Sequence, residues 1–175
     1  MIQRFVVFAT ILFVHISAVK LEDFPEEYRE LMPERVKSLI VGLSSQEQAT
    51  MKEVYENLHT YKNDQEVVAA IRAKSPGLAS KLEQFQSWWS EKAAGLGPEA
   101  RAYFDAMHEN AYKIRARFYA GKRPSNAEIK QAALETITKY KALSAAAKAD
   151  FQKQFPLLTR MLSNDETYKA IQSLN

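Results

Sequence analysis

Glycine and proline divide this chain into segments of helical length. Its five glycines and six prolines all fall between stretches rich in alanine, glutamate, lysine, glutamine and leucine, which are good helix formers. Since helix interiors exclude proline and disfavour glycine, these positions are predicted helix boundaries. The intervening segments hold no alternating strand pattern of useful length, so an all-α fold is predicted.

Helix-start signals agree with these boundaries. Ser44 and Ser125 are each followed by a glutamate three residues later, the spacing of a capping box. Pro76 and Pro98 stand where a first helical turn tolerates proline. The pattern predicts a single domain of about nine short-to-medium amphipathic helices, near residues 24–31, 33–41, 45–61, 64–74, 76–95, 98–120, 126–143, 145–162 (broken at Pro156) and 164–173.

The first eighteen residues have the order of a secretory signal peptide. Arg4 precedes an apolar run over residues 5–14, interrupted only by Thr10, and Ile16–Ala18 offers a cleavage site. The run covers half of the roughly 20 residues that a membrane-spanning helix needs, which argues against a membrane anchor. We therefore expect residues 1–18 to be removed and residues 19–175 to form a secreted, extracellular helical domain.

The absence of cysteine constrains how that domain is stabilised. Small secreted domains usually depend on disulfides, whereas this one must be held by apolar packing between helices. Aromatic residues make up 11% of the chain, and short helices with bulky apolar faces can enclose a cavity as readily as a solid core. The composition permits an apolar, ligand-sized cavity without requiring one.

Charge and motif content point away from nucleic acid and from catalysis. The 24 basic and 21 acidic residues are interleaved, and a net charge of +3 is too small to indicate a nucleic-acid-binding surface. The three histidines are isolated, and the chain has no metal-ligand spacing, phosphate loop or serine-nucleophile motif. The sequence predicts no metal, no cofactor, no catalytic residue and no enzyme.

Two helices carry the most informative faces. The segment 98–120 has an apolar stripe of Phe104, Met107, Ala111, Ile114 and Phe118, flanked by a partly polar line of His108, Tyr112, Arg115 and Tyr119. That line is either an ordinary helix edge or the polar rim of a cavity, with Arg115 facing an anionic group. In the segment 76–95, spacing places Trp89 near the centre of the apolar face and Trp88 on its flank.

Several helix junctions carry a family resemblance. These are Phe24–Tyr28, Leu31–Val36, Leu43–Glu47, Tyr61–Asp64, Lys74–Pro76, Tyr140–Ser144 and Phe155–Pro156. In this order and spacing the chain resembles the nematode fatty-acid- and retinol-binding proteins over nearly all of its mature length. The resemblance implies a helical fold around a large cavity, and binding of fatty acids and retinol. It also implies a casein-kinase-II-type site, which Ser44 and Glu47 match, although the same pair is a good capping box.

The leading hypothesis is therefore a secreted lipid carrier, a monomer that binds fatty acids and retinol and makes transient contact with membranes. Its expected ligand-binding residues are Leu58, Phe85, Trp89, Met107, Ala111, Ile114, Phe118, Ile137 and Phe151, with Arg115 binding a carboxylate near water. The alternative is a secreted helical module with a solid core that binds host or receptor proteins. An internal apolar cavity distinguishes the two hypotheses.

Overall fold

The computed structural model describes residues 26–122 and 124–173 of the chain. The predicted signal peptide, residues 1–18, lies outside them. Within the described residues the protein is all-α, as predicted. Its elements are α2 (Glu26–Leu31), α3 (Glu34–Val41), α4 (Ser45–Glu56), the 3₁₀ turn η3 (Leu58–Thr60), α5 (Asp64–Lys74), α6 (Pro76–Ala94), α7 (Pro98–Tyr119), α8 (Asn126–Lys141), α9 (Ala145–Gln154), α10 (Pro156–Ser163) and α11 (Asp165–Gln172).

Local signals explain most of these helix ends. Both predicted capping boxes are present, at the starts of α4 and α8. The helix predicted over 45–61 ends earlier, at Glu56, because the Asn57 side chain donates a hydrogen bond to the Glu53 carbonyl at 2.8 Å and caps it. The helix predicted over 145–162 is two helices, α9 and α10, because Pro156 has no amide hydrogen with which to continue the helix.

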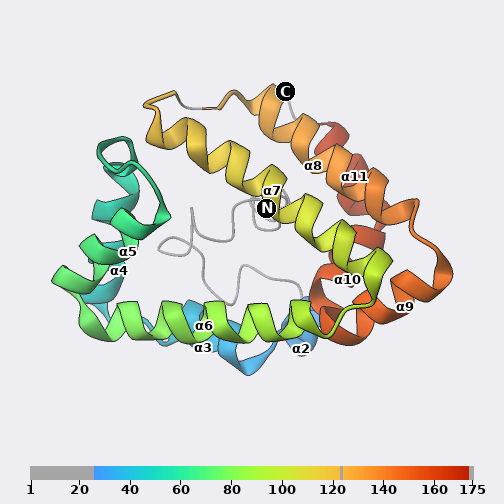
Figure 1. Ribbon diagram of the computed structural model, residues 1–175, viewed down its shortest axis with the longest axis horizontal. Helices are drawn as coiled ribbons and strands as arrows, with labels where there is room; N and C mark the ends of the chain where they lie inside the picture. The colour runs from blue at the N-terminus through green and yellow to red at the C-terminus, as the bar shows by residue number, and fades with distance from the viewer. Residues whose placement is uncertain (1–25, 123, 174–175) are drawn as a thin grey trace.

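The two longest described helices, α6 and α7, form the frame of the molecule. They meet at the Gly95–Gly97 turn and diverge from it (Figure 1). α8 lies along α7, while α4 and α5 lie across the end of the wedge that is farthest from the turn (Figure 1). α9 to α11 gather beside α7 and α8 near the turn, so the wedge opens towards α4 and α5.

Two main apolar clusters hold the helices together. The first cluster takes its residues from the helices between α2 and α6, together with Leu157 and Met161 of α10. The second takes its residues from the end of α6 and from the helices between α7 and α11. Trp89 packs against both clusters, with its ring centroid 4.9 Å from that of Phe155 and 5.8 Å from that of Phe104. The apolar packing is therefore continuous around Trp89, at the inner end of the wedge. None of the described helices is long and apolar enough to cross a membrane.

Candidate functional site

A partly open cavity of about 230 Å³ lies between α4, η3, α5, α6 and α7. Its volume is just below the roughly 300–1,000 Å³ typical of small-ligand pockets. Most of its wall is apolar, as in such pockets. The apolar lining residues are Met51, Val54, Leu58, Val67, Val68, Ile71, Leu82, Phe85, Trp89, Met107 and Ala111.

Helical periodicity turns these side chains towards one space. Met51 and Val54 are three residues apart on one face of α4, and Leu58 follows at a step of four residues, in η3. Leu82, Phe85 and Trp89 have the same spacing on α6. α6 and α7 diverge from the turn that joins them (Figure 1). Side chains of both helices line the cavity.

One corner of the cavity is charged. Arg115 of α7 donates a hydrogen bond from Nη2 to Oδ2 of Asp64, at 3.2 Å, and Tyr119 donates one from its hydroxyl to Oδ1 of the same carboxylate. The Arg115 side chain is 13% exposed, and its guanidinium carbon lies 6.0 Å from the centroid of the Tyr112 ring. Arg115 Nε is buried and has no hydrogen-bond partner among the described residues. The guanidinium therefore retains an unused donor beside the cavity.

Tyr119 and His108 are the titratable side chains beside this ion pair. Burial, helped by the hydrogen bond to Asp64, raises the pKa of Tyr119 well above its ordinary value, so its hydroxyl stays protonated and donates to Asp64. Burial, followed by the positive charge of Arg115, lowers the pKa of His108 from its ordinary value. The lowered pKa favours the neutral imidazole at pH 7, so the formal charges at this corner are those of Arg115 and Asp64.

The structure brings six of the ten expected ligand-binding residues to the cavity wall. They are Leu58, Phe85, Trp89, Met107, Ala111 and Arg115. Arg115 was expected to keep its head group near water, and it is instead mostly buried and paired with Asp64. That pairing lowers the cost of burying the guanidinium.

The other four expected residues lie outside this cavity. Ile114 is buried in a small cluster with Ala132 of α8, and Phe118 packs on that cluster, 6.4 Å from the Tyr55 ring centroid. Ile137 and Phe151 are in the second main cluster, where Phe151 is fully buried. These four side chains are therefore not among the lining residues of this cavity, and their contact with a ligand stays a prediction.

The α5 wall and two polar residues were not among the expected site residues. Val67, Val68 and Ile71 come from α5, and Asp64 stands at its first position. Tyr119 belongs to the polar line recognised beside the α7 stripe, so helical spacing from Arg115 is the signal that points to it. Nothing in the spacing of α5 alone distinguishes a cavity wall from a core face.

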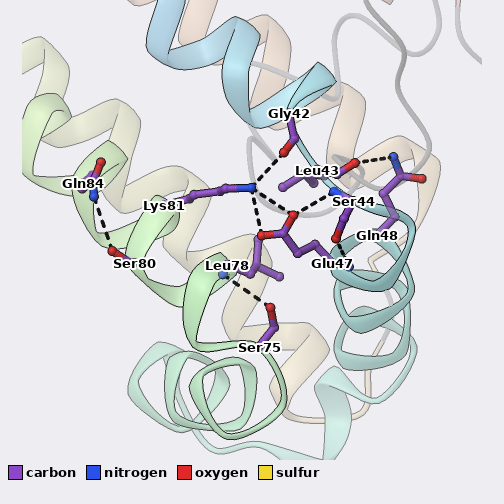
Figure 2. Close-up of polar contacts among 10 residues, drawn as sticks. All are labelled: Gly42, Leu43, Ser44, Glu47, Gln48, Ser75, Leu78, Ser80, Lys81 and Gln84. Atoms are coloured by element: carbon purple, nitrogen blue, oxygen red, sulfur yellow. Dashed lines mark hydrogen bonds and ion pairs between the residues drawn. The ribbon is translucent and has the colours of Figure 1, made fainter.

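Ser44, the phosphorylation candidate, caps α4 at a junction outside the cavity wall. Its hydroxyl accepts a hydrogen bond from the Glu47 amide at 3.2 Å, and its own amide donates to the Glu47 carboxylate at 2.7 Å (Figure 2). Lys81 of α6 donates to the same carboxylate at 2.9 Å and to the Gly42 carbonyl at 2.8 Å (Figure 2). In this structure Ser44 and Glu47 therefore join the α3–α4 junction to α6.

These features define the class of the protein. Within residues 26–122 and 124–173, no group of three or more histidine, cysteine, aspartate or glutamate side chains could hold a metal ion. The described fold is a disulfide-free helical wedge that encloses a partly open, mainly apolar cavity with one charged corner. It is the architecture of a helical protein with a site for an apolar small molecule.

Comparisons with known proteins give the family. The family model for the nematode fatty acid retinoid binding protein (Gp-FAR-1) matches residues 26–174. The chain therefore belongs to this family, which confirms the resemblance drawn from the helix junctions.

Individual relatives agree with this assignment. The chain is 31% identical over 150 residues to fatty-acid and retinol-binding protein 1 of Caenorhabditis elegans, covering 86% of this chain and 82% of that protein. It is 31% identical over 145 residues to fatty-acid and retinol-binding protein 2 of the same organism, covering 83% and 80%. The solved structure of Na-FAR-1, the fatty acid and retinol binding protein of Necator americanus, superposes with a TM-score of 0.60 at 38% identity. That match covers 88% of this chain and 99% of the other.

Proposed function

We propose that this protein is a secreted carrier that binds fatty acids and retinol in the cavity between α4 and α7. The observation that carries the proposal is the partly open, mainly apolar cavity in a chain of this family. The names of its relatives supply the ligands. A cavity also favours a carrier over the alternative of a solid-core interaction module.

The ligand would lie with its hydrocarbon against the apolar walls and its polar end at Arg115. An acyl chain or isoprenoid chain needs no hydrogen-bond partners, which suits the side chains of α4, α5 and α6. A fatty-acid carboxylate needs donors, and the Arg115 guanidinium offers them in a fork that matches a carboxylate. The retinol hydroxyl is neutral and has less need of that charge. The wall and Arg115 hold the ligand without any covalent step, so no catalysis is assigned.

Binding can be measured with the mature chain, residues 19–175. A fluorescent fatty acid should brighten and shift to the blue on binding, and unlabelled oleate or retinol should reverse both changes. The proposal is wrong if the probe does not respond and the purified protein yields no lipid on extraction.

The role of Arg115 has its own test. Arg115→Ala should weaken oleate binding by at least about tenfold, the loss expected for one charge-assisted contact, and should weaken retinol binding less. Arg101→Ala is the matched control, because Arg101 lies on the same helix and pairs with Asp105 on the exposed surface. Equal losses for oleate and retinol would remove Arg115 from this role.

Secretion rests on the order of residues 1–18 and on the family. N-terminal sequencing of the protein recovered from the medium of secreting cells should begin at Val19. Recovery only within cells, with Met1 retained, would contradict the signal peptide. Transient membrane contact during ligand delivery is part of the same proposal. Transfer of the fluorescent fatty acid to vesicles should then speed up as the vesicle concentration rises.

A further inference from the structure

Arg115 is already occupied by a carboxylate of the protein itself. Asp64 is the first residue of α5 and lies on a different wall of the cavity from α7. It accepts hydrogen bonds from both Arg115 and Tyr119. A fatty-acid carboxylate would pair with the same guanidinium, so this site has an internal competitor for an anionic ligand.

The charges around the cavity disfavour a second carboxylate beside Asp64. Among the described lining residues the cationic side chain is Arg115, and the acidic ones are Asp64 and Glu83. Glu83 is already paired with Arg72 on the neighbouring helix. An ionised fatty acid at Arg115 would therefore lie close to Asp64 without a second cation to offset the repulsion between them.

Exposure indicates which partner of the Asp64–Arg115 pair can move. The Asp64 side chain is 48% exposed, whereas that of Arg115 is 13% exposed. An aspartate this exposed has room to turn towards water, while the buried Arg115 stays beside the cavity with its unused Nε. The pair is thus one fixed donor and one displaceable acceptor.

We propose that Asp64 is a specificity-determining residue that competes with fatty-acid carboxylates for Arg115 and so favours neutral lipid alcohols over anionic fatty acids. This inference rests on the proposed carrier function. A neutral alcohol can donate to the Asp64 carboxylate or accept from the unused Nε of Arg115 without displacing any charge. An anionic ligand must displace Asp64 or lie beside it.

The chain offers a closely matched control for the substitution. Asp165 is also the first residue of its helix, follows an asparagine N-cap, and pairs with a basic residue of another helix, Lys141, at 2.7 Å. Neither Asp165 nor Lys141 lines the cavity. Asp165→Asn therefore removes the same helix-terminal charge and one ion pair without changing the site.

The test compares oleate and retinol affinities of wild type, Asp64→Asn and Asp165→Asn by displacement of the fluorescent fatty acid. Asp64→Asn removes the like charge, so it should bind oleate at least about tenfold more tightly than wild type. Its affinity for retinol should stay within about threefold of the wild-type value. Asp165→Asn should change neither. Asp64→Glu, which keeps the charge, should retain the wild-type ratio of the two affinities.

Other outcomes separate this inference from the carrier function. If Asp64→Asn leaves oleate affinity unchanged or weakens it, or strengthens both ligands equally, the specificity role is wrong while the carrier proposal stands. If wild type binds neither lipid, the carrier proposal itself fails. Circular dichroism checks the fold of each variant. If Asp64→Asn does not fold, Asp64→Ser replaces it, because serine is small, carries no charge and leaves the Asn63 cap in place.

Discussion

Phe151 provides a sharp test of the separation between packed core and ligand cavity. Its side chain is fully buried, and its ring centroid lies 5.3 Å from that of Tyr103, 5.8 Å from that of Tyr140 and 5.2 Å from that of Phe155. These rings surround it with aromatic contacts of the second cluster. None of these four residues lines the cavity. Truncation should therefore affect folding and leave the site unchanged.

Phe151→Ala should lower the free energy of unfolding by about 4 kcal/mol, since Phe→Ala substitutions in well-packed cores cost about 3–5 kcal/mol. For a chain of this length that loss lowers Tm by about 8–16 °C. Urea denaturation followed by circular dichroism measures the first quantity, and a thermal scan the second. Oleate affinity, measured where the variant is folded, should stay within about threefold of wild type.

Phe85→Ala is the matched substitution at the cavity wall. Phe85 is also buried, but it faces the cavity on one side. Its loss should weaken oleate binding by at least about tenfold. The reasoning is refuted if Phe151→Ala costs less than about 1 kcal/mol, or if both variants weaken oleate binding equally.

Three further predictions concern the cavity and the junction at α4. Ala111→Phe should raise the free energy of unfolding by about 1 kcal/mol and weaken oleate binding, because the added ring fills part of the cavity. If the centre were a solid core, the same substitution would lower the free energy of unfolding by about 1–3 kcal/mol through overpacking. Glu47→Gln should lower stability at pH 7. The hydrogen bond from Lys81 lowers the pKa of Glu47, so its stabilisation is complete above about pH 4.5 and is lost as the pH falls through the lower folded-state pKa. The urea midpoints of wild type and Glu47→Gln should therefore converge in acid; a constant difference would contradict this role. Retinol should quench the tryptophan fluorescence of Trp88→Phe more than that of Trp89→Phe, because Trp88→Phe keeps Trp89 at the cavity wall. Equal quenching of the two variants would place the ligand elsewhere.

Sequence patterns predicted the helices well because their signals are local. A capping box such as Ser44–Glu47 places its hydrogen bonds within four residues, and Pro156 breaks a helix whatever surrounds it. The end of α4 was missed because Asn57 caps it through its side chain, without the glycine or proline that marks other boundaries. Such a cap is a weaker signal, since asparagine also occurs inside helices.

The cavity could be predicted only in part because it depends on how helices diverge. The α7 stripe is continuous in sequence, yet Met107 faces the cavity while Ile114 is buried against α8. Periodicity shows which face is apolar and not what that face meets. The pairing of Asp64 with Arg115 joins positions 51 residues apart, and no local pattern identifies such a partner.

The four methionines of the described residues allow the most direct test of ligand binding in the cavity. Met51 and Met107 line it, whereas Met32 and Met161 are buried in the first cluster and are not among its lining residues. With ¹³C-methyl methionine and unlabelled oleate, intermolecular nuclear Overhauser effects should connect the acyl chain to Met51 and Met107. None should reach Met32 or Met161. Contacts to Met32 and Met161 without contacts to Met51 and Met107 would contradict this account of the binding site.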